Sequence, residues 1–185
     1  MKNRDKIIDK FIKWCDPHDI DFRMNIYANL VTKHYIESLS DNEFKDFFTK
    51  FVSEGGNVQT GGARTINQFE TTIEKELISF RSYVLEPFNK EFDLHDWFDH
   101  RKRFLGFGVG IATIFLNRID YKKYSIMNNK TLKSLNKLGY KISSSKNWTN
   151  YELVKKYQDE LISDYPILEN YFKADFLNHY VVVHL

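Results

Sequence analysis

The sequence predicts a mainly α-helical protein, a multi-helix bundle with one short strand at its C-terminal end. Apolar residues recur over most of the chain at the three- and four-residue spacing of a helix face. Only three prolines interrupt the 185 residues. Apolar residues make up 42% of the chain and aromatic residues 16%, so a core of ordinary size can be filled. We expect a single domain over 1–185, with a helical lobe over about 1–92, a second lobe over about 93–185, and a β-branched strand near 180–185.

The expected helices follow from apolar spacing and from the residues that start or stop a helix. Ser40 or Asp41 can cap a helix that carries four phenylalanines and stops at a glycine pair. Asp93 can cap a later helix in the same way. Pro17 and Pro87 close two others, because proline cannot continue a helix. The expected helical segments are 7–14, 26–35, 41–54, 65–84, 94–98, 109–119, 129–138 and 150–161.

Cysteine content and hydropathy indicate a reducing, aqueous compartment. Cys15 is the single cysteine, so no internal disulfide can form. No apolar run reaches the roughly 18–20 residues that a membrane span needs. Charges break up the N-terminal segment, which is unlike a signal peptide. We therefore expect a soluble, cytoplasmic protein that does not enter a membrane.

The charge of the chain is concentrated in one segment. The net charge is only +2, but residues 101–146 hold 11 lysines and arginines against one acid, Asp120, a net charge of +10. The flanking segments are both acidic. A basic island in an acidic chain is typical of a surface that binds a polyanion. The alternative is an ordinary solvated helix face.

A glycine-rich segment, 104–116, lies inside this basic island. Gly106, Gly108 and Gly110 permit a tight turn and leave no side chain in its way. The helix that follows presents free N–H groups and the positive end of its dipole, which suits a phosphate oxygen. Arg101, Lys102 and Arg103 stand directly before the turn and add positive charge. The alternative is a connection whose glycines only let two helices pack closely.

This segment resembles the helix-hairpin-helix motif of DNA-binding proteins. That motif reads approximately Leu-Pro-Gly-hydrophobic-Gly, then two residues, Thr-Ala and an apolar helix. Gly106 and Gly108 fall on the two hairpin glycines, Phe107 on the apolar residue between them, and Ala112 on the small residue of the second helix. The resemblance implies a hairpin that binds the phosphate backbone of duplex DNA without reading its sequence.

A second stretch, 124–139, is similar to the segment that follows the hairpin in helix-hairpin-helix DNA glycosylases. The resemblance implies a glycosylase-like architecture but not the chemistry. Asn128 falls on the catalytic aspartate, and an amide cannot act as a carboxylate base. Gly110 falls on the lysine of the bifunctional members, so no amine is present for a Schiff base. We expect a protein without catalytic residues, although Asp120 or Asp96 could replace the missing acid.

The nearest resemblance is to the N-terminal DNA-recognition domain of McrB-type modification-dependent restriction proteins. In that family a Gly-x-Gly hairpin and an Ala-Thr or Ala-Ser helix precede a Tyr-Pro-Ile-x-Asn segment, and Ser125 stands here where proline is common. The resemblance implies recognition of methylated or otherwise modified DNA for a fused or adjacent GTPase motor and nuclease. The sequence itself holds no phosphate-binding loop of the Gly-x-x-x-x-Gly-Lys type, so we expect no nucleotide hydrolysis and no cofactor.

A polar, glycine-dense loop at 55–64 is a further candidate for DNA contact. Gln59 and Arg64 are suited to enter a groove or to fill the gap left by an extruded base, and the alternative is a flexible connection. The full set of expected contact residues is Arg101, Lys102, Arg103, Gly106, Phe107, Gly108, Gly110, Asn129, Lys130, Lys133, Lys137, Gln59 and Arg64.

Two further patterns are weaker indications of a functional site. His95 with Asp99, and Asp96 with His100, are four residues apart on a helix, but two ligands do not close a metal site, so we expect capping and surface pairing. Aromatic residues could line a pocket for an extruded base, although most have core spacing. The candidates for such a pocket are Tyr27, Tyr35, Trp97 and Trp148.

Two alternative functions remain. One is a glycosylase or lyase with an unconventional acid, and the other is a protein-interaction module.

Overall fold

The computed structural model describes residues 3–15, 21, 31–54 and 62–185. Within those ranges the chain is helical and contains no strand, so the mainly α-helical multi-helix bundle is confirmed. The helices are α1 (Asn3–Trp14), α3 (Lys33–Ser38), α4 (Asp41–Glu54), α5 (Ala63–Leu85), η2 (Glu86–Phe88), α6 (Leu94–His100), η3 (Arg101–Arg103), α7 (Val109–Ile119), α8 (Asn129–Lys137), α9 (Trp148–Asp164), η4 (Pro166–Leu168) and α10 (Tyr171–Val183).

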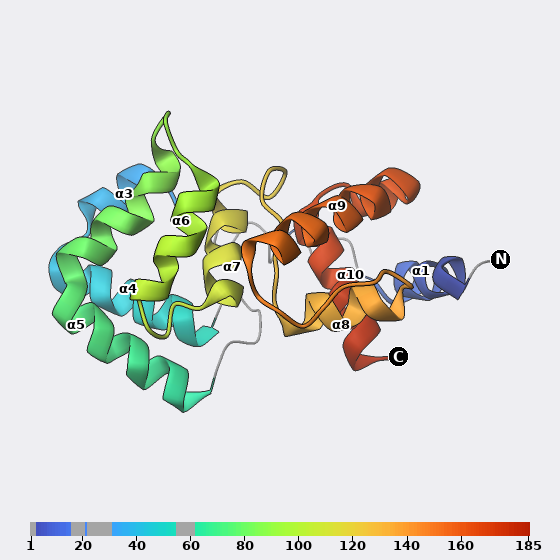
Figure 1. Cartoon of the computed structure of the whole chain (residues 1–185), viewed down its shortest axis with the longest axis horizontal. Coiled ribbons are helices and arrows are strands. Elements are labelled where there is room, and N and C mark those ends of the chain that lie inside the picture. Colours follow the sequence, from blue (N-terminus) through green and yellow to red (C-terminus); the bar gives the residue numbers. More distant parts are fainter. Residues whose placement is uncertain (1–2, 16–20, 22–30, 55–61) are drawn as a thin grey trace.

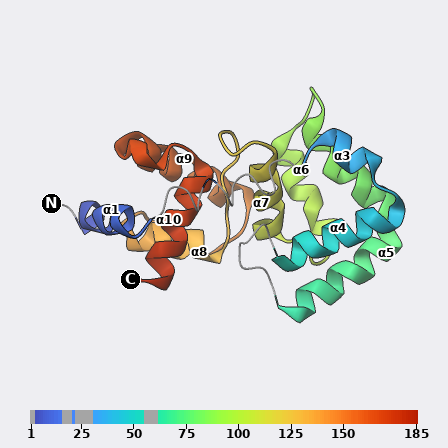
Figure 2. The same ribbon diagram turned by 180° about the vertical axis from the view of Figure 1, so that it is seen from behind.

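The helices form two groups with α7 between them (Figures 1 and 2). One group contains α3, α4, α5 and α6. The other contains α8, α9 and α10, and α1 packs against α10 in this second group. The N-terminal helix therefore lies with the C-terminal helices, although its position in the sequence suggests the first lobe.

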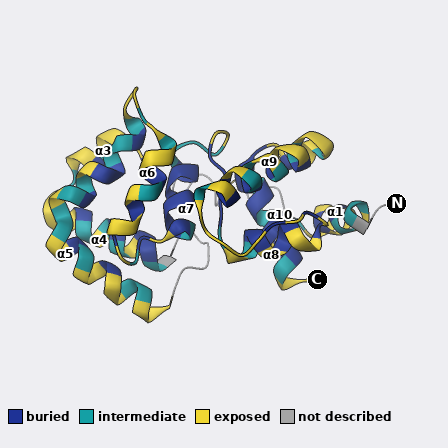
Figure 3. Ribbon diagram, viewed as in Figure 1, coloured by how far each residue is buried: buried dark blue, intermediate teal, exposed yellow. Residues whose placement is uncertain are grey.

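Helix α7 is the most deeply buried element. Nine of its 11 residues are buried, which Figure 3 shows as an almost continuous buried ribbon. Ile111, Ile114 and Phe115 belong to the core of the first group, and Val109 belongs to the core of the second. Because α7 is buried on nearly every side and contributes to both cores, it joins the two groups into one molecule.

The core of the first group is built from aromatic rings. The ring of Phe80 packs edge-on against Phe48 and Phe107, with centroids 5.1 Å from each. Phe48 also contacts Phe115, at 5.7 Å. Such contacts add to the free energy gained by burying the rings, about 0.5–1.5 kcal/mol each.

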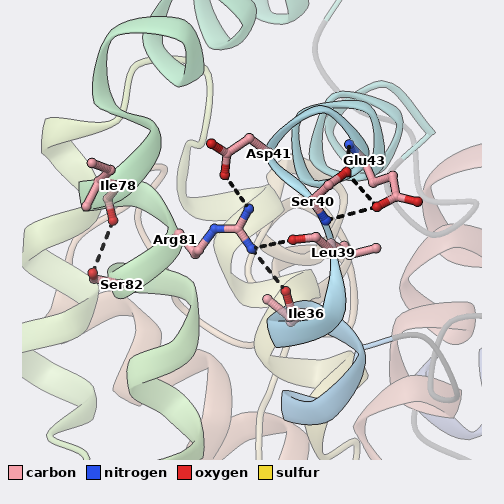
Figure 4. Close-up of polar contacts among 8 residues, drawn as sticks. All are labelled: Ile36, Leu39, Ser40, Asp41, Glu43, Ile78, Arg81 and Ser82. Carbon is pink, nitrogen blue, oxygen red and sulfur yellow. Dashed lines mark hydrogen bonds and ion pairs between the residues drawn. The ribbon is translucent and has the colours of Figure 1, made fainter.

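Arg81 of α5 ties this core to the turn between α3 and α4 (Figure 4). Its guanidinium donates hydrogen bonds to the carbonyl oxygens of Ile36 (3.3 Å) and Leu39 (3.0 Å) and pairs with Asp41 at 3.0 Å. It also lies over the ring of Phe44, 4.2 Å from the centroid. One side chain thus satisfies the carbonyl groups at the end of α3, which have no partner within the helix.

The expected strand at 180–185 is wrong, because residues up to Val183 belong to α10. The side chain of Asn170 accepts a hydrogen bond from the Lys173 N–H and starts this helix. Most of α10 is buried among α1, α8 and α9, and a helix buried on most sides shows no one-sided apolar period. Tertiary packing has overridden the β-propensity of the valines. No helix in the described ranges is long and apolar enough to cross a membrane.

Replacing Arg81 tests the link between α5 and the α3–α4 turn. We expect Arg81→Met to lower the free energy of unfolding by about 2 kcal/mol, because two carbonyl groups lose a charged donor. Lys75→Met, at an exposed position of the same helix, should change it by less than about 0.5 kcal/mol. Urea denaturation followed by circular dichroism measures both, and equal effects of the two substitutions would contradict the assignment.

Candidate nucleic-acid interface

The segment 104–108 connects η3 to α7 by a tight turn. The Phe107 N–H donates to the Phe104 carbonyl at 3.0 Å, and Gly106 between them has a φ of +86°. Phe107 is fully buried in the aromatic core, whereas Leu105 at the tip of the turn is 61% exposed. The order of elements is therefore helix, turn and helix, with one apolar side chain anchoring the turn and another facing solvent.

Gly106 lies directly against the backbone of α5. A Cβ atom at this position would stand 2.5 Å from Cβ of Phe69 and 2.6 Å from the carbonyl oxygen of Thr65. Both the positive φ and this close approach require glycine. The role that the structure shows for Gly106 is thus packing: it lets the turn rest on the first turns of α5.

The N-terminal end of α7 is open. Gly108 is the N-cap residue and offers no side-chain hydrogen bond, and a Cβ atom added there would meet nothing within 4 Å. The first backbone N–H group that forms a helical hydrogen bond is that of Ala112, which donates to the Gly108 carbonyl oxygen at 2.9 Å. The N–H groups of Val109, Gly110 and Ile111 precede it and have no acceptor inside the helix. They carry the positive end of the helix dipole.

This helix end opens into a hollow of about 520 Å³, which we call the hairpin pocket. Lys130 and Lys133 of α8 and Lys146 contribute positive charge to its wall. No acidic side chain is among the described residues that line it. The lining residues are Thr65, Gly108, Val109, Gly110, Ile111, Ile114, Asn128, Asn129, Lys130, Lys133, Lys146 and Val182.

The neighbouring helix α8 has a closed N-terminal end. The Asn128 side chain accepts a hydrogen bond from the Thr131 N–H at 3.0 Å, and the Thr131 hydroxyl accepts from the Asn128 N–H, which completes a capping box. A Cβ atom on Gly110 would lie 3.4 Å from Cβ of Asn128. The two positions that the glycosylase resemblance equates with catalytic aspartate and lysine are thus adjacent, but neither carries the required group.

Lys146 and Thr65 also line the pocket, and neither is among the expected contact residues. Lys146 lies in the loop before α9 and Thr65 in the first turn of α5, both far in sequence from the hairpin. Neighbouring protein atoms remove part of the water around the ammonium group of Lys146 and so lower its pKa, although the residue as a whole is exposed. An anion in the pocket would replace that lost solvation. Membership of Lys146 in the basic island is the only sequence signal that points to it.

The three basic residues before the hairpin mainly form contacts with other residues of the protein. Arg101 is 5% exposed, lies 3.8 Å over the ring of Phe98, and donates to the carbonyl oxygen of Lys146 at 3.1 Å. Lys102 pairs with Asp99 at 3.0 Å. Arg103 is exposed and pairs with Glu76 of α5 at 2.8 Å. Arg101 therefore holds Lys146 near the pocket and is not itself accessible to a ligand.

The other expected contact residues are more scattered. Lys130 lies 3.0 Å from Nδ1 of His179, and Lys137 donates to the carbonyl oxygen of Val181 at 3.3 Å. Asn129 is exposed at the pocket rim. Arg64 is exposed outside the hairpin pocket, beside a second hollow. Gln59 lies outside the described residues.

The alternative acids do not reach the hairpin pocket. The Asp120 carboxylate accepts hydrogen bonds from the Lys122 and Lys123 N–H groups in a local turn. Asp96 lines a separate hollow near Glu86. His95 stacks on Trp148 with centroids 4.8 Å apart, and the described residues bring no three potential metal ligands together.

The described aromatic candidates do not line the hairpin pocket. Trp97 is 1% exposed and stacks on Tyr83. Tyr35 packs edge-on against Phe47. Trp148 contacts His95 and Phe98, and Tyr27 falls outside the described residues. Among the described aromatic candidates, each thus makes a contact within the protein.

No protein-family model matches this chain, and comparisons with curated proteins and with solved structures found no match either. The resemblance to helix-hairpin-helix domains therefore stays a prediction that depends on the residues of 104–116 and 124–139.

One carboxyl group, Asp175 of α10, is buried beside Thr131 and Lys130. Burial raises its pKa to about 6, while the charges of Arg118 and Lys130 and a hydrogen bond from Thr131 act in the opposite direction. A raised pKa in the folded state means that the folded protein holds a proton that the unfolded chain has already released.

Stability should therefore fall as pH rises across the window between the two pKa values of Asp175. We expect wild type to lose up to about 3 kcal/mol relative to Asp175→Asn between about pH 4 and pH 6, and no more above it. Urea denaturation of both proteins across this range gives the difference, in which the titration of shared histidines cancels. A difference that does not vary with pH would show that Asp175 is not held protonated.

Two glycine substitutions test which glycine of the hairpin is required by close packing and which faces open space. We expect Gly106→Ala to lower the free energy of unfolding by at least about 2 kcal/mol, because of its φ and its contact with α5. Gly108→Ala meets open space and should cost less than about 1 kcal/mol. Thermal or urea denaturation compares them, and a well-tolerated Gly106→Ala would mean that the turn does not rest on α5 as described.

Proposed function

We propose that this chain is a non-catalytic module that binds duplex DNA, with a backbone phosphate held in the hairpin pocket. The observation that carries the proposal is the convergence of the open end of α7 with Lys130, Lys133 and Lys146 on one hollow whose described lining holds no acid. Free N–H groups at a helix start and lysines around them are what a phosphate oxygen needs.

The pocket favours binding over catalysis. Asn128 holds its amide oxygen in the cap of α8, and Gly110 has no side chain. Neither a carboxylate nor an amine stands at the positions that a glycosylase uses. The acids that could replace them, Asp96 and Asp120, do not line the pocket, so no observation favours an unconventional glycosylase or lyase over a binding module.

The wider role that we propose is recognition of methylated or otherwise modified DNA for a restriction system in the cytoplasm. The support is the resemblance of 104–116 and 124–139 to the DNA-recognition domain of McrB-type proteins. A fused or adjacent GTPase motor and nuclease would then act on the DNA that this module holds. Phosphate contacts alone carry no information on sequence or modification, so this role needs a second surface.

The proposal predicts salt-dependent binding that depends on the lysines of the pocket. We expect the affinity for a plain duplex to fall steeply with salt, and Lys133→Gln with Lys146→Gln to reduce the slope of log K against log salt by up to about two, since each phosphate contact contributes about 0.9. Fluorescence anisotropy of a labelled duplex across a salt series measures the slope. Neither lysine has a side-chain hydrogen bond or ion pair with a described residue, so their removal should leave the fold intact.

The matched control is Lys10→Gln with Lys13→Gln on α1. Both lysines are exposed and neither lines the hairpin pocket, and α1 lies at one end of the molecule, whereas α7 lies between the two groups of helices (Figure 1). This control should keep the wild-type slope. A wild-type affinity that does not change with salt, or equal slopes for the two double variants, would favour a protein-interaction module instead.

A further inference from the structure

Five polar side chains share one exposed side of the first turns of α5, which we call the α5 face. They follow the helical spacing i, i+3, i+4, i+7 and i+8, and with Leu105 they surround a shallow hollow of about 580 Å³. The α5 face consists of Arg64, Asn67, Gln68, Thr71 and Thr72. It lies at the edge of the molecule, where α5 begins (Figures 1 and 3).

These residue types are the ones that read base edges. Asparagine and glutamine form paired hydrogen bonds with adenine, arginine with guanine, and threonine contacts the methyl group of thymine. The Thr71 and Thr72 hydroxyls donate to the carbonyl oxygens of Asn67 (2.9 Å) and Gln68 (2.8 Å), which leaves their methyl groups for apolar contact. The side chains of Arg64, Asn67 and Gln68 form no hydrogen bond or ion pair with any residue that the structure describes.

The α5 face combines good and poor helix formers. Arginine and glutamine have a high helix propensity, whereas asparagine and threonine have a lower one. The core side of the same turns, at Phe69 and Ile73, is fully apolar. The exposed side of these turns carries the side chains of Arg64, Asn67 and Gln68, which no described hydrogen bond or ion pair uses and which are therefore available to an external partner. Glu70 and Glu74 are also exposed on these turns.

The α5 face and the hairpin pocket are fixed relative to each other. Leu105 borders the hollow of the α5 face, and Gly108, three residues later, borders the hairpin pocket. On α5, Arg64 belongs to the face and Thr65 to the pocket. The close contact of Gly106 with the α5 backbone locks this arrangement. A duplex whose phosphate sits in the pocket would thus have α5 beside it.

We infer that the α5 face enters the major groove and reads base edges while the hairpin pocket holds the backbone. An α-helix with its side chains is about 10–12 Å wide, which matches a groove about 12 Å wide. The inference rests on the proposed function, because it takes duplex DNA as the partner. It adds the specificity that the phosphate contacts cannot supply.

The test begins with selection of preferred sites by the wild-type chain from a randomised duplex library, in plain and cytosine-methylated form. Binding of the selected and of scrambled duplexes is then compared for wild type and Asn67→Ala with Gln68→Ala. We expect the double variant to lose about 10-fold or more in preference for the selected site, since a paired contact to a base is worth about 1–3 kcal/mol. Its affinity for the scrambled duplex and its salt slope should stay at the wild-type values.

Two controls make the outcomes distinct. Asn42→Ala with Asn89→Ala removes two exposed amides elsewhere on the surface and should keep the preference. Lys133→Gln with Lys146→Gln should weaken the selected and scrambled duplexes equally. Binding without any selectable preference, or a preference that survives in the Asn67/Gln68 variant, would overturn the inference and leave the proposed function standing. Absence of salt-dependent duplex binding by wild type would overturn both.

Discussion

The contact between Gly106 and the first turns of α5 is the constraint on which the surface of this protein depends. The turn can approach the carbonyl of Thr65 and the Cβ of Phe69 only because position 106 lacks a side chain and accepts a positive φ. Phe107 then inserts into the aromatic core and α7 starts immediately after it. The open end of α7 is thereby set against α5 on one side and α8 on the other.

The basic island divides into charges that build the protein and charges that face outward. Arg101 and Arg118 are buried, and Arg118 donates to Asn117 and lies over the ring of Phe172. Lys102 and Arg103 are exposed but neutralised by acids of α6 and α5. Lys133 and Lys146 line the hairpin pocket and form no ion pair with a described residue. The net charge of a segment therefore overstates how many of its charges a ligand can contact, because a buried guanidinium cannot reach the ligand and a paired one already has an acidic partner.

Signals local in sequence predict much of this fold. The cap at Asp93, the phenylalanines of α4 and the apolar run of α7 each specify a helix through neighbouring residues, and the structure has those helices. The prediction of a strand at the C-terminal tail is wrong because α10 is buried on most sides. Its valines therefore have the composition of a strand and show no helical period. Arg101 turns inward for a similar reason: only the tertiary structure brings Phe98 and the Lys146 carbonyl to its guanidinium.

The candidate site shows the same division between local and distant signals. The glycines of the hairpin can be read from the sequence, because each acts on residues next to it. Thr65 and Lys146 reach the pocket from loops and helices far along the chain, so no spacing rule finds them.

Under the proposed function, the arrangement divides two tasks of a DNA-binding protein between two surfaces. Backbone N–H groups and lysines grip a phosphate equally well beside any base, so the hairpin pocket can hold a duplex in register but cannot choose among duplexes. Choice needs side chains with both donors and acceptors, and the α5 face carries them on the part of α5 that precedes its kink at Glu76. Because Gly106 fixes the turn on that helix, a change in the packing of the hairpin would move the hairpin pocket relative to the α5 face. A protein built this way would lose specificity before it loses affinity.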